Sequence, residues 1–355
     1  MTKSNLKFFK NSKSLPVDTF FRNVLYDKKI GYYNTKIPFG DKGDFITAPK
    51  ISNLFSEIIS IWFILTWQKL GRPKNFNIVE LGPGDGELVK TLIRVSKKFP
   101  DFNAAKKIFL YEISEKLINI QKKNINDKNI RWIKNFDKIK DGPIVFFGNE
   151  FFDAIPIKQY KRSKNTLYER FYFINKKFEI KETFKKVLKK ELAFLNSFKT
   201  LKNQKFIEFP KLGFKKLNNI VKKILKQDGC IMLIDYGYLQ PNNQNTLQSV
   251  MRHKKNKLLK NLGKADVTSH VNFNLLSEFF KKNSFKVEKI ISQSEFLKKM
   301  GIIERAELMT KKMKFRDKAN LYLRLKRLLS PKLMGNLFKV ILAYNFKNDK
   351  NLDFK

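Results

Sequence analysis

An apolar run, Phe76–Leu81, leads straight into a glycine turn with the sequence Glu80-Leu81-Gly82-Pro83-Gly84-Asp85-Gly86. A helical pattern over residues 88–98 follows, so the turn stands where a first strand feeds a first helix. Glycines at such a turn let the backbone approach a bound ligand closely. Three glycines at alternate positions therefore predict a ligand-binding turn rather than one that needs glycine for its own geometry.

The carboxylates of this turn distinguish between two kinds of ligand. A dinucleotide site needs its third glycine one residue later than Gly86, with a helix N-terminus open to a diphosphate. The turn instead carries Glu80, Asp85 and Glu87, which would repel phosphate groups. No Gly-Lys-Ser/Thr follows, which excludes a P-loop. We therefore expect a ligand with an ammonium and a sulfonium but no phosphate, namely S-adenosylmethionine.

Strands and helices alternate along the rest of the chain. Continuous apolar strands between helices are typical of a parallel sheet with both faces covered. We expect an α/β fold, a doubly wound, Rossmann-like sheet with an N-terminal helical segment and an inserted substrate-recognition subdomain. The expected strands are 76–81, 107–112, 130–133, 144–148, 229–236 and 285–291, with 338–344 as a last edge strand, and the expected helices are 16–27, 52–70, 88–98, 114–124 and 272–283.

Changes of pattern along the chain predict four parts. An N-terminal helical segment and a lid loop occupy residues 1–75, and the S-adenosylmethionine-binding core occupies residues 76–159. Residues 160–227 form an insertion for substrate recognition, which opens with the alternating pattern of a hairpin. Residues 228–355 complete the core and include an inserted, polar loop over 240–270.

An acidic residue ends the second expected strand. Glu112 stands where ribose hydroxyls are bound in such sheets, and an ionised carboxylate only accepts hydrogen bonds. It follows the glycine turn by more than the ~20 residues that are usual there. We attribute the extra length to a loop over residues 99–106.

Two further segments bring polar side chains to the same edge of the sheet. Asn149-Glu150-Phe151-Phe152-Asp153 follows the fourth strand, on the side of the sheet where ligands bind. The loop 43–52 is polar, contains glycine and runs into a helix, as a lid over the cofactor would. The predicted cofactor-binding residues are therefore Glu80, Gly82, Gly84, Gly86, Glu112, Asn149, Asp44 and Thr47.

The composition limits the classes of site and of location. The 355 residues are 42% hydrophobic and 14% aromatic, which is enough for a large core. A single cysteine, Cys230, and two histidines exclude a disulfide framework, a cysteine-rich zinc site and an iron–sulfur cluster. No apolar stretch reaches the ~20 residues of a membrane span. No secretory signal pattern follows Met1, so we expect the bacterial cytoplasm, or the mitochondrial matrix in a eukaryote.

The net charge of +42 has two explanations. A strongly basic chain is typical of proteins that bind nucleic acid or anionic membranes. Here 63 of the basic residues are lysine and 11 are arginine, dispersed along a sequence that is rich in Lys, Asn, Ile and Phe. Arginine is the residue that binds phosphates and guanine edges bidentately. We therefore attribute the charge to composition and do not expect nucleic acid as a partner.

Several motifs together resemble a known family. The chain resembles the MidA-type family, whose mitochondrial members are complex I assembly factors that act as protein arginine methyltransferases. The resemblance covers residues from about 15 to 275 and weakens after about 285. The motifs that carry it are 43–52, 80–86, Asn149-Glu150-Phe151-Phe152-Asp153-Ala154-Ile155-Pro156, Asp235-Tyr236-Gly237-Tyr238, Thr246-Leu247-Gln248-Ser249 and 263–273, in family order.

The resemblance implies a class I methyltransferase fold and S-adenosylmethionine as the cofactor. For the mitochondrial members it also implies symmetric dimethylation of an arginine on the complex I subunit near the quinone site. We therefore expect a protein substrate here, with a respiratory complex I subunit as its identity by resemblance.

Arginine methylation requires acidic groups that face the methyl donor. A charged guanidinium is a poor nucleophile with a pKa above about 12, and carboxylates can grip it and draw its charge away from one nitrogen. Glu150 and Asp153 are three residues apart and can share such a site. His270 lies in Asp266-Val267-Thr268-Ser269-His270, which can line the substrate side. The predicted catalytic residues are Glu150, Asp153 and His270.

Two alternatives to this function remain open from the sequence. An RNA methyltransferase would agree with the basic charge, although base-methylating enzymes usually carry Asn or Asp followed by Pro-Pro and an aromatic residue where Asn149-Glu150-Phe151-Phe152 stands. A non-catalytic assembly module would keep the fold and bind a respiratory-complex subunit without methyl transfer.

Overall fold

The computed structural model describes residues 3–38, 40, 43–44, 47–241, 243–347 and 352. The chain folds into two compact units, each made from three stretches of sequence. Unit 1 comprises Met1–Phe45, Phe152–Asn218 and Tyr238–Phe279. Unit 2 comprises Ile46–Phe151, Asn219–Gly237 and Phe280–Lys355.

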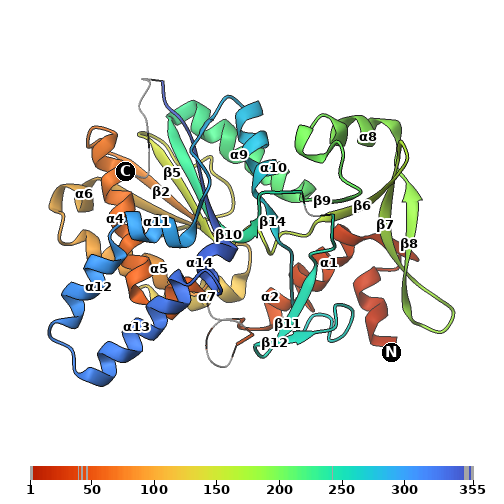
Figure 1. Cartoon of the computed structure of the whole chain (residues 1–355), viewed down its shortest axis with the longest axis horizontal. Coiled ribbons are helices and arrows are strands. Elements are labelled where there is room, and N and C mark those ends of the chain that lie inside the picture. The colour runs from red at the N-terminus through yellow and green to blue at the C-terminus, as the bar shows by residue number, and fades with distance from the viewer. Residues whose placement is uncertain are drawn as a thin grey trace. The chain divides into compact units, whose positions relative to one another are not determined.

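Unit 2 is built on a sheet in the order β15-β17-β10-β5-β2-β3-β4 (Figure 1). The five strands from β10 to β4 are parallel, which confirms the predicted doubly wound sheet. β17 runs antiparallel to β10. The strands are β2 (Phe76–Leu81), β3 (Lys106–Tyr111), β4 (Arg131–Ile133), β5 (Ile144–Asn149), β10 (Gly229–Tyr238), β15 (Lys286–Val287), β16 (Ile291–Ser292) and β17 (Phe338–Asn345).

Two predictions about the last strands were wrong. Residues 285–291 do not form one strand, because β15 and β16 are two separate strands of two residues each. The strand expected at the edge, β17, lies inside the sheet, with β10 on one side and both short strands on the other. Its buried, almost continuous apolar sequence agrees with an interior position.

The core of unit 2 follows the two-residue period of the strands. Ile78, Val145, Phe147, Met232 and Leu342 point to one face and join a single apolar cluster with the helices packed there. α4 (Asn53–Lys69) supplies much of that cluster and is buried over most of its length, as its mainly apolar sequence predicts. The Ser52 side chain caps α4 by accepting a hydrogen bond from the Leu54 backbone N–H at 3.3 Å.

The remaining elements of unit 2 are helices. Residues 99–106, expected as a loop, contain the helix α6. α9 and α10 begin in unit 1 and end in unit 2. The helices are α3 (Ala48–Ile51), α4 (Asn53–Lys69), α5 (Glu87–Ser96), α6 (Pro100–Ala105), α7 (Glu115–Asn124), α9 (Lys211–Gln227), α10 (Phe273–Lys282), α11 (Gln293–Lys299), α12 (Ile302–Thr310), α13 (Phe315–Leu329) and α14 (Met334–Leu337).

Unit 1 contains two antiparallel sheets. The larger has the order β1-β7-β6-β9 with β8 paired to β7, and the smaller has the order β12-β11-β13. The expected hairpin is therefore confirmed, whereas the region expected as an inserted loop contains three short strands. The elements are η1 (Lys3–Phe9), β1 (Ser14–Pro16), α1 (Val17–Tyr26), α2 (Tyr32–Thr35), β6 (Lys158–Ser163), β7 (Thr166–Ile174), β8 (Ile180–Lys186), α8 (Lys189–Asn196), η2 (Lys199–Leu201), β9 (Phe206–Phe209), β11 (Gln248–Met251), β12 (Lys254–Asn256), β13 (Asp266–Thr268) and β14 (Val271–Asn272).

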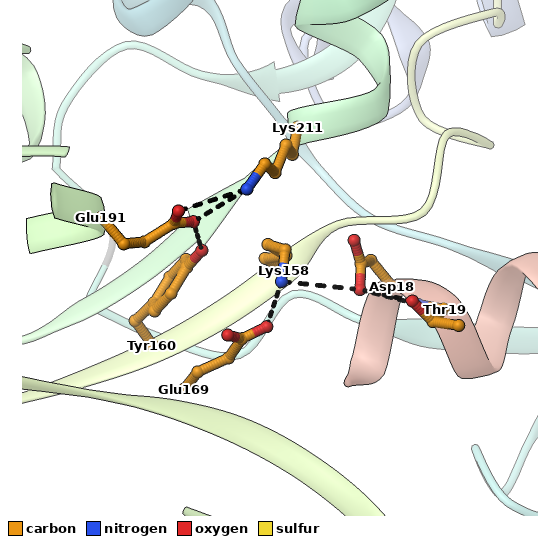
Figure 2. Close-up of polar contacts among 7 residues, drawn as sticks. All are labelled: Asp18, Thr19, Lys158, Tyr160, Glu169, Glu191 and Lys211. Atoms are coloured by element: carbon orange, nitrogen blue, oxygen red, sulfur yellow. Dashed lines mark hydrogen bonds and ion pairs between the residues drawn. The ribbon is translucent and has the colours of Figure 1, made fainter. Parts of the chain in front are cut away.

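Charged side chains fasten α1 and α8 to the larger sheet of unit 1 (Figure 2). The Lys158 ammonium pairs with the Glu169 carboxylate and lies 4.0 Å from Asp18. All three side chains are largely buried. Burial raises the pKa of Glu169, and the hydrogen bond from Lys158 opposes that rise. The network holds its charges by mutual pairing, as buried ions must.

A second part of the same network lies nearer the surface. The Tyr160 hydroxyl donates a hydrogen bond to Glu191 at 2.8 Å, and the Lys211 ammonium lies 3.2 Å from the same carboxylate. Lys211 is about half exposed, so its ion pair is screened by water.

Among the described residues, no helix is long and apolar enough to cross a bilayer.

Candidate active site

The glycine turn of unit 2 joins β2 to α5 in a left-handed backbone. Gly82, Gly84 and Gly86 have φ values of +64°, +59° and +87°. A Cβ at Gly82 would lie 3.0 Å from the Phe151 ring, and one at Gly86 would lie 2.5 Å from the Ile125 side chain. The turn therefore needs glycine for its own conformation as well as for any close approach of a ligand.

Glu80 lies at the end of β2, just before this turn. Its side chain is buried, and its Oε2 atom has no hydrogen-bond partner among the described residues. Burial, and to a smaller extent the charge of Asp85, raises the pKa of Glu80 to about 8. A buried carboxyl oxygen without a partner is costly, so this position fits a ligand that donates hydrogen bonds.

The other carboxylate of the turn is already paired. The Asp85 carboxylate forms an ion pair with the Lys50 ammonium at 2.6 Å, and both side chains are partly exposed. The Asp85 carbonyl oxygen also accepts a hydrogen bond from the Asn124 side chain at 3.0 Å. The negative charge that faces the turn is therefore smaller than a count of its acidic residues indicates.

Gln121 of α7 connects the turn to two neighbouring strands. Its amide Nε2 donates to the Gly84 carbonyl oxygen at 2.8 Å and to Glu112 Oε2 at 3.4 Å. Its Oε1 accepts a hydrogen bond from the Trp132 indole N–H at 2.9 Å. The side chain is completely buried, so these bonds replace water that it cannot reach. Sequence reasoning missed Gln121 because a polar residue in a lysine-rich helix looks like part of a solvated face.

Glu112 is held in place by the backbone at the end of β3. Its Oε1 accepts hydrogen bonds from the Ile113 and Ser114 N–H groups at 2.7 and 2.8 Å. The Ser114 side chain in turn caps α7 by accepting from Leu117 N–H. The carboxylate is therefore fixed between the turn of β3 into α7 and the Gln121 amide.

The end of β5 carries a backbone strain at a charged residue. Glu150 has φ +50°, in the left-handed region that residues other than glycine rarely adopt. Its backbone N–H donates to Ile234 O at 2.9 Å, and its Oε1 accepts from Asn149 Nδ2 at 3.1 Å and from Ala48 N at 3.2 Å. Strain of this kind persists where surrounding contacts impose it, and it is frequent at functional sites.

Thr47 precedes Ala48 at the N-cap position of α3. Its carbonyl oxygen accepts hydrogen bonds from Lys50 and Ile51 N–H. The loop expected as a lid contains Phe45 and Ile46, which lie outside the described residues. Thr47 therefore lies beside Ala48, whose N–H donates a hydrogen bond to Glu150 just after β5.

In unit 1, Asp44 and Asp153 lie near a third buried carboxylate. Asp44 accepts a hydrogen bond from the Tyr32 hydroxyl at 2.6 Å and another from Arg252 N–H at 2.6 Å. The Asp153 carbonyl oxygen accepts from Ser269 N–H at 3.0 Å. The third carboxylate, Asp266, was not predicted as a site residue.

The pKa of Asp266 reflects the proximity of the other two acids, Asp153 and Asp44. Burial raises its pKa to about 8, and the charges of Asp153 and Asp44 add to that rise. The Tyr33 hydroxyl and Val267 N–H donate hydrogen bonds to it at 3.1 and 2.9 Å, which oppose the rise. Unit 1 thus brings three carboxyl groups together, two of which accept hydrogen bonds from tyrosine hydroxyls.

His270 lines a small hollow in unit 1. Glu208, Ser269 and Asn272 supply the other polar groups of its wall. The backbone N–H of His270 donates to the Thr246 hydroxyl at 3.0 Å, and that hydroxyl donates to Glu208. Burial lowers the pKa of His270, so the imidazole is neutral at neutral pH.

The predicted site residues therefore fall into two sets. Unit 2 holds one set at the carboxyl ends of β2, β3 and β5, and unit 1 holds the other. The first set is Glu80, Gly82, Gly84, Gly86, Glu112, Asn149, Glu150 and Thr47, and the second is Asp44, Asp153 and His270.

Comparison with known proteins identifies the family. A family model described as "Putative S-adenosyl-L-methionine-dependent methyltransferase" matches residues 58–291, well over half of the chain. The chain belongs to this family. The match spans the glycine turn and the ends of β3, β5 and β10, so it covers the predicted site residues other than Asp44 and Thr47.

Relatives of this methyltransferase align with most of its sequence. It is 28% identical over 360 residues to the human protein arginine methyltransferase NDUFAF7, mitochondrial, covering 93% of this chain and 80% of the relative. The homologue of that protein in Caenorhabditis elegans is 29% identical over 323 residues, covering 84% and 73%. The Xenopus tropicalis protein of the same name is 27% identical over 329 residues, covering 85% and 76%.

A solved structure confirms the fold of this methyltransferase. A protein from Burkholderia thailandensis, crystallised with S-adenosyl-homocysteine, superposes with a TM-score of 0.81 at 21% identity, covering 96% of this chain and 90% of that chain. The predicted class I methyltransferase fold is therefore confirmed.

Proposed function

We propose that this methyltransferase transfers a methyl group from S-adenosyl-L-methionine to an arginine side chain of a protein partner. The observation that carries the proposal is the position of Glu150 just after β5. Its backbone is left-handed, and its carboxylate accepts hydrogen bonds from the Asn149 side-chain amide and from Ala48 N–H. The names of the relatives as protein arginine methyltransferases support the same acceptor.

The residues of unit 2 fit the methyl donor. Glu80 offers a buried oxygen that lacks a partner, which suits the ammonium group of the methionine part. The Gly82, Gly84 and Gly86 turn brings backbone rather than side chains to the ligand. We assign Glu112 to the ribose hydroxyls and Asn149, Asp44 and Thr47 to the remaining polar groups. When bound, the donor supplies an activated methyl group on its sulfonium.

The catalytic roles that we propose belong to three residues. Glu150 and Asp153 grip the guanidinium and draw its charge away from the nitrogen that accepts the methyl group. His270, kept neutral by burial, accepts the proton that this nitrogen must lose. Phe151, packed against Gly82, keeps water from the glycine turn.

The substrate and compartment follow from resemblance. We propose a respiratory complex I subunit as the partner, and the mitochondrial matrix as the compartment if the chain is eukaryotic, or the bacterial cytoplasm otherwise. The word mitochondrial in the names of the relatives supports the first of these compartments. An interaction with nucleic acid is not part of the proposal.

The test separates donor binding from methyl transfer. The full chain is incubated with methyl-labelled donor and with protein or RNA fractions, and methylated residues are identified by mass spectrometry. We expect label on arginine in protein, and a loss of at least about a hundredfold in rate for Glu150→Gln with donor affinity retained. Glu304→Gln, an exposed acid of α12, is the matched control and should behave as wild type.

Three results would contradict the proposal. The first is label that appears only on RNA. The second is an unchanged rate in Glu150→Gln. The third is a loss of donor binding in that variant in step with its rate, since this would make Glu150 a donor ligand rather than a catalytic residue.

A further inference from the structure

Helix α13 in unit 2 has two apolar stripes on opposite sides. The inner stripe holds Leu321, Leu325 and Leu328 at the spacing i, i+4, i+7. Leu325 and Leu328 are buried in the core cluster, and Leu321 packs against it. Burial of this stripe stabilises α13 and fixes its position against the core of unit 2.

The outer stripe of α13 contacts no core. Phe315, Ala319, Tyr322 and Leu323 follow the spacing i, i+4, i+7, i+8, which ordinarily marks a face turned to a protein interior. All four are exposed, Phe315 by 88% and Leu323 by 64%. Since neighbouring apolar side chains rarely gather in water without a partner, this stripe indicates an interaction surface.

Basic side chains surround the outer stripe. Residues 311–327 contain eight lysines and arginines and a single acid, Asp317, and all eight basic side chains are exposed. Three of the chain's 11 arginines, Arg316, Arg324 and Arg327, lie in this one helix. The basic residues, dispersed along the rest of the chain, are therefore clustered in this segment.

The position of the stripe points to a flat partner. α12 and α13 meet at a corner of unit 2 away from the strands, as Figure 1 shows, and Phe315 is the first residue of α13 at that corner. The segment lies after the residues matched by the family model. α13 contacts α3, the helix that begins after Thr47, so the stripe and the strand ends of the candidate site belong to the same unit.

We propose that the outer face of α13 binds the surface of an anionic phospholipid membrane. Phe315, Tyr322 and Leu323 would enter the boundary between headgroups and acyl chains, and the basic side chains would lie among the phosphates. A second copy of the chain is a poor occupant because both copies carry +42. An acidic protein would satisfy the charges but would ordinarily offer a groove for the apolar stripe, and a bilayer needs none.

The first experiment measures binding of the full chain to lipid vesicles by co-sedimentation. The vesicles are phosphatidylcholine alone or phosphatidylcholine mixed with phosphatidylglycerol, at low and at raised salt. Because the whole chain is basic, charge alone will attract it to the mixed vesicles at low salt. We expect binding that persists at raised salt for the wild type and falls by at least about tenfold in Phe315→Ser/Leu323→Ser.

The control variant removes an exposed leucine elsewhere. Leu188, in unit 1, is 79% exposed, so Leu188→Ser makes the same chemical change outside the stripe. It should bind vesicles as the wild type does. Thermal unfolding of each variant checks that the fold is intact, which the exposure of these side chains predicts.

A second experiment keeps the three large apolar residues of the stripe, Phe315, Tyr322 and Leu323. Ala319→Cys is labelled with an environment-sensitive dye, and Leu188→Cys is labelled as the control. Labelling is specific because Cys230, the natural cysteine, is completely buried. We expect a blue shift of the dye at position 319 with anionic vesicles and none at position 188.

Two results would overturn the proposal. One is equal binding of the wild type and Phe315→Ser/Leu323→Ser to anionic vesicles at raised salt. The other is an unchanged dye at position 319 on those vesicles, with a blue shift produced instead by an acidic amphipathic peptide, which would assign the stripe to a protein partner.

Discussion

The side-chain amide of Gln121 donates a hydrogen bond to the carbonyl oxygen of Gly84 at 2.8 Å, and so fixes the middle of the glycine turn to helix α7. The same side chain accepts from the Trp132 indole, which lies on β4. The turn is therefore braced from behind by a buried amide rather than by its own backbone alone. Such a brace holds a binding loop in one conformation before any ligand arrives.

Replacing Gln121 should loosen the turn. Gln121→Ala removes three hydrogen bonds and leaves the partly buried Trp132 N–H without its partner, which costs ~1–3 kcal/mol of stability. Donor affinity should fall by at least about tenfold as the turn loses its support. Asn124→Ala is the matched control, because Asn124 bonds the same turn from an exposed position. Thermal unfolding and calorimetry with S-adenosyl-homocysteine measure both effects, and equal losses in the two variants would argue against a special role for Gln121.

Glu80 should make stability depend on pH. The folded chain holds this proton to about pH 8, whereas the ordinary pKa of a glutamate, expected in the unfolded chain, is 4.5. A rise in pH between those values therefore favours the unfolded state. Glu80→Gln should match the wild type in acid, gain stability over it as pH rises, and reach a constant advantage of a few kcal/mol above about pH 8.

The measurement is urea unfolding of both proteins without ligand across that pH range. A constant difference between Glu80→Gln and wild type at every pH would show that the carboxyl group ionises normally in the folded chain.

The left-handed backbone at Glu150 should be visible in two substitutions that both remove the carboxylate. Glu150→Gly relieves the strain of φ +50°, whereas Glu150→Ala keeps it. Glu150→Gly should therefore be the more stable of the two by about 1 kcal/mol. Both should lose methyl transfer. Urea unfolding gives the comparison, and a more stable alanine variant would mean that Glu150 does not adopt this conformation in solution.

Lys158 should matter more to stability than Lys211. Lys158→Met leaves Asp18 and Glu169 buried with no cation between them, which costs ~3–5 kcal/mol. Lys211→Met removes an ion pair that is half exposed and should cost at most about 1 kcal/mol. Urea unfolding followed by circular dichroism compares them, and similar losses would show that the network in Figure 2 is open to solvent.

Much of unit 2 was predictable because its strands are short, apolar and bounded by breakers. β2 matched its expected range in full, and Ser114 was placed correctly at the start of α7. The position of β17 was not predictable, since pairing between distant strands leaves no local signal. α6 was missed because six residues are too few to show a helical period. β12, with the sequence Lys254-Lys255-Asn256, lacks apolar alternation altogether.

The candidate site was partly predictable for the same reason. Acids at the ends of strands, such as Glu80 and Glu112, stand out against apolar runs. Gln121 and Asp266 do not, because their burial depends on contacts between distant segments. The outer stripe of α13 was also missed, since its apolar residues follow the same helical period as a core-facing stripe and only the fold shows which side is exposed.

The account rests most directly on the glycine turn as the site of S-adenosyl-L-methionine. Calorimetric titration with this cofactor should show binding by the wild type and none by Gly84→Val, because a β-branched residue cannot adopt φ +59° without strain in the turn. Gly301→Val is the control, since Gly301 has φ +80° at the start of α12 and should bind as the wild type does. A folded wild type that binds no cofactor, or a Gly84→Val variant that binds it normally, would contradict the account.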